Sequence, residues 1–161
     1  MNDRPSVVRM PDLTRRQFSL TVEREFPASA SVLFEAWTRR FDLWFAAPGS
    51  VLMRPAVNEP FFFETEYKAE SDAAVQRHPH YGRFLQLTPN QLVQLTWVTG
   101  AGGTEGAETI VTVELEPRAQ RTRLRLSHAG FASEAARDAH DRAWPAVLEQ
   151  LEKRLAALQA G

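Results

Sequence analysis

The last thirty residues carry a regular spacing of apolar and aromatic positions. Seven residues recur at helical intervals and fall on one face: His140, Trp144, Val147, Leu148, Leu151, Leu155 and Leu158. The pattern predicts a long amphipathic helix from about Ser133 to Leu158. Pro145 lies inside this segment, so we expect either a kink near Trp144 or a shorter helix that begins there with Pro145 in its first turn.

Upstream of this helix, apolar and polar residues alternate with the period of β-strands. Within Phe18 to Phe26, Leu20 and Val22 share one face, while Glu23 and Glu25 lie on the other. Short strands separated by tight turns favour an antiparallel sheet with one solvent-exposed face. The predicted strands are 18–26, 51–54, 61–67, 81–87, 92–98, 109–116 and 121–128.

Two short helices are predicted between the first two strands. Ser29 is a favourable N-cap for a helix that runs to Trp37, and a second helix covers roughly residues 40–45 before Pro48. A series of strands followed by one amphipathic helix predicts an α+β fold. In it, a curved antiparallel sheet wraps around the long C-terminal helix.

Bulky rings on the inner face of the sheet and at the start of the long helix tend to hold these two layers apart. We therefore expect an apolar pocket between them, which takes an apolar, aromatic small molecule. The alternative is that the same rings simply fill a core. The expected lining of the pocket is Phe61, Phe63, Tyr67, Trp97, Trp144 and Val147, with Trp44 and Phe45 near its mouth.

Composition narrows the class of protein. The 161 residues suit one domain, and 43% hydrophobic with 24% charged residues is typical of a globular chain. Nineteen basic and twenty acidic residues give a net charge of -1, which argues against a nucleic-acid partner. There is no cysteine, no apolar run of membrane-spanning length and no signal peptide, so we expect a cytoplasmic protein. Residues 1–16 are predicted to be a flexible arm, and 17–161 the domain.

Two histidines are candidates for chemistry. Strand alternation places His128 inside, and helical periodicity places His140 on the inner stripe, so the two can approach each other. A buried histidine can orient a ligand or act as a general base. The alternative is a hydrogen-bonded core or rim histidine, which we favour because no third catalytic group has a defined place.

Other polar residues are candidate ligand contacts. His78 and His80 share a strand face, but Pro79 and the lack of nearby acidic residues or cysteine argue against a metal site. Arg24 and Arg83 suggest either an anionic ligand group or structural ion pairs. Tyr81 is a candidate hydrogen-bond partner for a ligand.

The order of the predicted elements resembles the START-like superfamily, which has the helix-grip (Bet v 1/START-like) fold. Within it the chain resembles the branch named after the activator of Hsp90 ATPase, over about residues 17 to 158. The likeness is carried by FPA at 26–28, VLFEAWT at 32–38, FDLWFAAP at 41–48, YGRFLQLTP at 81–89, LVQLTW at 92–97, HAGF at 128–131 and AW at 143–144. Two family features differ, since Asn58-Glu59-Pro60 stands where a glycine pair is common and Ala143 precedes Trp144 in place of glycine.

The resemblance implies a helix-grip fold and leaves the function open among three hypotheses. The first is the binding or sequestration of a small hydrophobic ligand, which can be related to stress. The second is a module that contacts an Hsp90-type chaperone through its surface. The third is a cyclase-like or hydrolytic enzyme that uses His128, His140 or Tyr81. No cofactor and no metal are expected, and exposed strand edges make a homodimer plausible.

Overall fold

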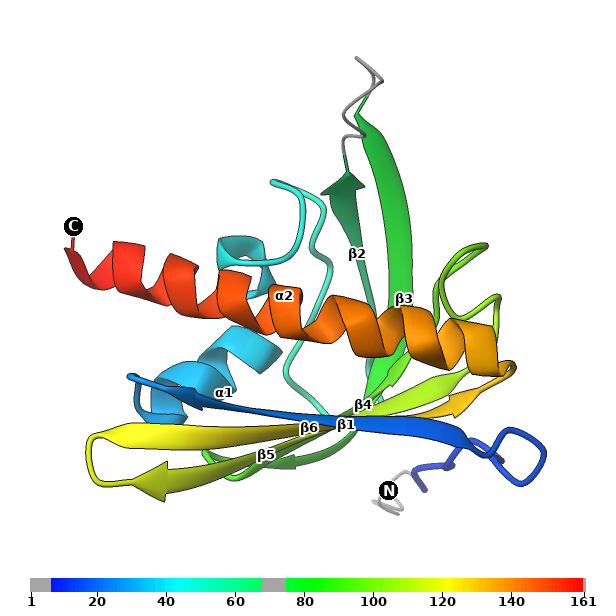
Figure 1. The fold of residues 1–161 in the computed structure, drawn as a ribbon, viewed down its shortest axis with the longest axis horizontal. Coiled ribbons are helices and arrows are strands. Elements are labelled where there is room, and N and C mark those ends of the chain that lie inside the picture. Colours follow the sequence, from blue (N-terminus) through cyan, green and yellow to red (C-terminus); the bar gives the residue numbers. More distant parts are fainter. Residues whose placement is uncertain (1–6, 68–74, 161) are drawn as a thin grey trace, which may run out of the picture.

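The computed structural model describes residues 7–67 and 75–160, without the side chains of Tyr67 and Ala160. One antiparallel sheet has the strand order β1-β6-β5-β4-β3-β2. It curves around the long helix α2 (Glu134–Ala160), which crosses its concave side (Figure 1). The strands are β1 (Phe18–Phe26), β2 (Pro60–Tyr67), β3 (Gln76–Thr88), β4 (Leu92–Trp97), β5 (Thr109–Arg118) and β6 (Arg121–Phe131). The predicted α+β helix-grip fold is confirmed.

The segment between β1 and β2 holds one α-helix and one 3-10 turn. Helix α1 (Ala30–Thr38) begins as predicted, because the Ser29 hydroxyl accepts a hydrogen bond from the Val32 amide. The second predicted helix is shorter than expected: η1 covers only Phe41–Leu43. The amides of Phe45 and Ala46 both bond to the Phe41 carbonyl, so the turn closes on itself and does not continue.

The expected strand at 51–54 is wrong. Only Leu52 pairs with β2, through a single bridge to Phe62. Pro55 follows almost at once and lacks an amide hydrogen, so it cannot extend the ladder. By contrast, β3 begins five residues before the predicted start, at Gln76, and runs through Pro79.

The core lies between the concave face of the sheet and the two helices. Trp37 of α1 is fully buried and contacts Trp144 of α2, with ring centroids 6.1 Å apart. Helix α2 is continuous through Pro145, so the shorter helix considered as an alternative is excluded. Leu158 is 53% exposed, which removes it from the predicted apolar stripe. None of the described helices is long and apolar enough to cross a membrane.

The N-terminal segment docks on the sheet from Arg9 onward within the described residues. The Arg16 guanidinium donates to the carbonyls of Glu108 and Gly130, at 2.9 and 2.8 Å. Leu13 packs over Gly130, whose φ is +96° and whose missing Cβ would lie 2.6 Å from the leucine side chain. The arm therefore joins the ends of β5 and β6 through specific contacts.

Candidate functional site

An open pocket of about 750 Å³ lies between α2 and the β2–β3 hairpin. Helix α2 packs chiefly against β1 and β6, at the opposite side of the sheet. The concave face of β2 and β3 is therefore left partly uncovered. Its described lining is Phe45, Thr65, Glu66, His78, Pro79, His80, Trp97, Thr99, Gly100, Ala101, Gly102, Gly103, His140, Ala143, Trp144, Val147 and Gln150.

Three aromatic rings form the apolar wall. Trp97 is the central one: its ring centroid lies 5.6 Å from that of Trp144 on α2 and 5.9 Å from that of Phe45 after η1. Both tryptophans are 3% exposed, so the pocket reaches the edge of the packed core. Rings with few polar atoms favour flat apolar ligands.

His128 lies behind this wall, fully buried on β6 and outside the pocket lining. The Trp144 indole N–H donates to its Nδ1 at 3.1 Å. The Thr109 hydroxyl donates to the Trp97 carbonyl at 2.5 Å, so it can only accept the hydrogen of His128 Nε2, 2.7 Å away. Burial lowers the pKa of His128 well below its ordinary value, and both ring nitrogens are occupied. His128 is thus a structural, neutral histidine, as the favoured alternative predicted.

His80 on β3 is 8% exposed and lines the pocket. Its ring stacks on Phe63, with centroids 4.8 Å apart and planes 12° apart, and meets Trp97 edge-on at 5.1 Å. Nδ1 lies 3.0 Å from the carbonyl oxygen of His78 and therefore carries the proton. Burial lowers the pKa of His80 to about 4, so the ring is neutral at pH 7 and Nε2 is an acceptor.

His140 on α2 faces the same pocket in the same tautomer. Nδ1 is 2.7 Å from the Ala136 carbonyl, one helical turn earlier, and donates to it. Burial lowers the pKa of His140, and the ring packs against Phe131 and His128 at 4.8 and 5.1 Å. The predicted approach of His128 and His140 is confirmed.

The loop after β4 forms the rim of the pocket and is internally bonded. The Thr99 amide donates to the Thr104 hydroxyl at 2.9 Å, and the Thr104 amide donates to the Thr99 hydroxyl at 2.7 Å. Gly103 lies against this pair: a Cβ there would be 2.0 Å from Thr99 Oγ1. The rim therefore has a defined shape.

Of the residues predicted for the site, Phe45, Trp97, His140, Trp144 and Val147 line the pocket. Phe61 and Phe63 point inward as predicted but are covered, Phe63 by the His80 ring.

Trp44 and Tyr81 correct our expectation. Trp44 is 2% exposed and sits in the core beside α1, where its indole N–H donates to the Ala36 carbonyl at 2.8 Å. Tyr81 follows His80 in β3, so alternation turns it to the opposite face, where it packs on Phe62 and is half exposed. The side chain of Tyr67 lies outside the described residues.

Sequence reasoning missed His80 and the rim loop as pocket residues. The sequence predicted His80 only as a possible metal ligand. His80 and Phe84 are four residues apart in one strand, so alternation places both on the inner face. That alternation was the available signal.

Neither arginine considered for an anionic ligand lines the pocket. Arg24 pairs with Glu152 at 3.1 Å, and Arg83 pairs with Glu108 at 3.3 Å, so both form structural ion pairs. Among the described residues, no group of three histidine, cysteine or acidic side chains is arranged to hold a metal ion.

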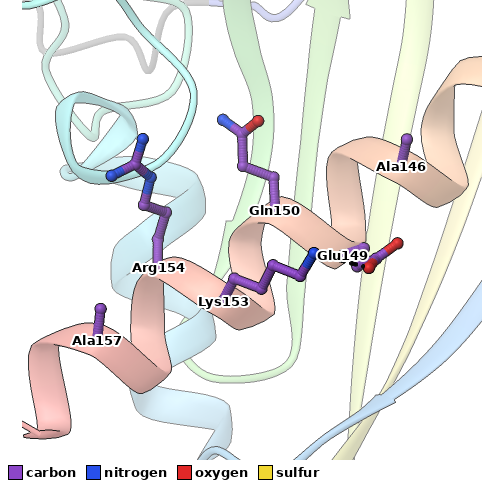
Figure 2. A pocket seen from close by; sticks show the side chains of 6 residues that line it. All are labelled: Ala146, Glu149, Gln150, Lys153, Arg154 and Ala157. Atoms are coloured by element: carbon purple, nitrogen blue, oxygen red, sulfur yellow. Dashed lines mark ion pairs between the residues drawn. The ribbon is translucent and has the colours of Figure 1, made fainter.

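A second hollow, of about 520 Å³, lies on the outer side of α2 (Figure 2). Ala146 and Ala157 lie at its two ends along the helix, and Lys153 and Glu149, which also line it, form an ion pair at 3.0 Å. Gln150 and Arg154 point to the same side, and the Gln150 amide donates to the Trp44 carbonyl. Its lining consists of exposed alanines and of polar or charged side chains, so it is a surface groove rather than an apolar site.

The sequence model of the family described as activator of Hsp90 ATPase homolog 1-like proteins matches residues 27–156. The chain belongs to this family. The resemblance to the START-like superfamily and to this branch is thereby confirmed. No curated protein matches the chain.

Several solved structures share the fold. Protein MLL2253 from Mesorhizobium loti is 24% identical, with 87% of this chain and 98% of that chain covered and a TM-score of 0.65. The Aha1 dimer from Colwellia psychrerythraea is 16% identical, with 84% and 93% covered and a TM-score of 0.59. An Hsp90 activator from Plasmodium falciparum is 23% identical, with 70% and 73% covered and a TM-score of 0.53. At these identities the likeness establishes the fold alone.

Proposed function

We propose that this family member binds a small, flat, largely apolar aromatic molecule in the pocket between α2 and the β2–β3 hairpin. The observation that carries the proposal is the pocket itself, about 750 Å³ of open space against Phe45, Trp97 and Trp144. A volume of this size holds a ligand of two to three fused rings, and burial of its apolar surface drives binding.

Two alanines of α2 offer a matched test. Ala143 and Ala146 are both exposed and three residues apart, but Ala143 lines the pocket and Ala146 lines the outer groove. Ala143→Trp fills the pocket and should abolish the binding of 2-methoxynaphthalene, followed by calorimetry. Ala146→Trp should leave that affinity unchanged. Failure of the unmodified protein to bind any member of a fused-ring aromatic panel would contradict the proposal.

An interaction with an Hsp90-type chaperone is the second candidate. It is favoured by the matching family description and by the neighbour solved as an Hsp90 activator. Such a module acts through its surface, so stimulation of the ATPase of an Hsp90 should persist in Ala143→Trp. Absence of any effect of the unmodified chain on the chaperone would rule out this role.

Self-association is a separate part of the proposal. One structural neighbour is described as a dimer, and β1 and β2 are the two edge strands of the sheet. Analytical ultracentrifugation of the purified chain tests it directly.

A further inference from the structure

The pocket presents two unused hydrogen-bond acceptors in an apolar wall. His80 and His140 come from different elements, yet each has its Nδ1–H directed at a backbone carbonyl, of His78 and Ala136 respectively. Each ring is therefore fixed in the tautomer that leaves a lone pair on Nε2. Neither Nε2 accepts a hydrogen bond from any part of the chain that the structure describes.

The two rings are also held rigidly. His80 lies between Phe63, stacked on its face, and the edge-on rings of Phe45 and Trp97 at 5.6 and 5.1 Å. His140 is wedged between Phe131 and His128 on β6. A preorganised acceptor loses little conformational freedom when a ligand donates to it.

The charge of the lining selects against anions. Among its described members there is no lysine or arginine, and Glu66 is the one acidic side chain. A carboxylate or phosphate in this pocket would face two lone pairs and the Glu66 carboxylate, whose partner cation Arg77, at 3.2 Å, lies outside the lining. A ligand that supplies hydrogen-bond donors satisfies the acceptors instead.

We propose that the pocket is specific for uncharged hydroxylated aromatic molecules, such as naphthalenediols and larger polyphenols, whose phenolic O–H groups donate to Nε2 of His80 and Nε2 of His140. The inference rests on the proposed function and narrows its ligand class. The aromatic rings lie against Trp97 and Trp144, and the hydroxyl groups reach the histidines at either side.

The test compares ligands that differ only in their donors. Calorimetry with 2-naphthol, 2,6-dihydroxynaphthalene and 2,7-dihydroxynaphthalene is set against their methyl ethers and against 2-naphthoate. At least one hydroxyl compound should bind about tenfold or more tightly than its ether, since each net hydrogen bond contributes about a two- to tenfold gain. The naphthoate should bind most weakly.

Variants assign the effect to the two residues. His140→Phe and His80→Phe keep an aromatic ring and remove the acceptor, so each should lower the ratio of hydroxyl-compound affinity to ether affinity about two- to tenfold. His140 is half-buried and its variant remains informative if His80→Phe fails to fold. Equal binding of hydroxyl compounds and ethers, or tightest binding of the naphthoate, would overturn the ligand class while leaving aromatic binding intact. If the unmodified protein bound none of these compounds, the proposed function itself would be refuted.

Discussion

Three hydrogen bonds in sequence fix the state of His128, from the Trp144 indole through the imidazole and the Thr109 hydroxyl to the Trp97 carbonyl. Each donor has one acceptor, so a second proton on Nδ1 would point at the indole N–H. We expect Thr109→Val to lower the free energy of unfolding by about 1–3 kcal/mol, because the buried Nε2–H of His128 loses its acceptor. Thr112→Val on the outer face of β5 removes one part-buried hydrogen bond from Gln94 and should lower the free energy of unfolding by less than about 1 kcal/mol. Urea unfolding measures both free energies. Equal losses of stability in the two variants would contradict the stabilising role of this series of hydrogen bonds.

His80 makes stability depend on pH. Its pKa is about 4 in the folded protein, lowered chiefly by burial from an ordinary value of 6.5. Between these values the unfolded chain binds more protons than the folded one, so stability rises with pH. The stability linked to His80 is fully present above about pH 6.5. As the pH falls toward 4, the free energy of unfolding drops by about 3 kcal/mol, because the unfolded chain gains a proton that the folded protein does not. His80→Phe should therefore show a shallower fall in Tm from pH 7 to pH 4 than the unmodified protein. Parallel curves would show that His80 does not titrate in this way.

At the scale of elements, the rim loop between β4 and β5 shapes the pocket mouth through the reciprocal bonds of Thr99 and Thr104. Gly103→Ala places a Cβ 2.0 Å from Thr99 Oγ1, while Gly100→Ala meets nothing within 4 Å. We expect Gly103→Ala to speed hydrogen exchange of the Thr99 and Thr104 amides at least tenfold, and Gly100→Ala to leave it unchanged. Unaltered exchange in both variants would show that the loop yields without losing these bonds.

Alternation and helical spacing predicted most of the elements because each carries its own pattern. Strand β1 was predicted with its observed bounds, and α2 to within two residues at each end. The start of β3 was missed because Gln76 to His80 is polar and contains a proline, and its pairing with β2 supplies the order that its own composition does not. Residues 51–54 show the reverse case: the segment is largely apolar, but it pairs with β2 only at Leu52.

The pocket itself depends on relations that no single segment encodes. Aromatic residues could be assigned to the inner face from the sequence, but whether they fill a core or line a space depends on where α2 lies across the sheet. Since it packs against β1 and β6, Trp97 and His80 reach the open side. Phe63 is covered by the His80 ring, and Trp44 is buried beside α1. The tautomers of His80 and His140 likewise follow from backbone carbonyls placed by the fold.

At the scale of the whole molecule, the N-terminal segment closes the end of the sheet. The Arg16 guanidinium bonds to Glu108 before β5 and to Gly130 in β6, and Leu13 lies over Gly130. Hydrogen bonds from a charged group to partly buried carbonyls contribute more than neutral ones. The segment predicted as a free arm should therefore contribute to stability.

Arg16→Ala should lower the free energy of unfolding by about 1–3 kcal/mol, because two carbonyls lose a charged donor. The exposed neighbour Arg15 is the matched control, and Arg15→Ala should change it by less than about 0.5 kcal/mol. Urea unfolding followed by tryptophan fluorescence suits the measurement, since all four tryptophans are buried at 3% exposure or less. Because neither Glu108 nor Gly130 lines the pocket, ligand affinity should stay constant in both variants. Indistinguishable stabilities of the two variants would mean that residues 7–16 act as an independent arm despite their contacts with the sheet.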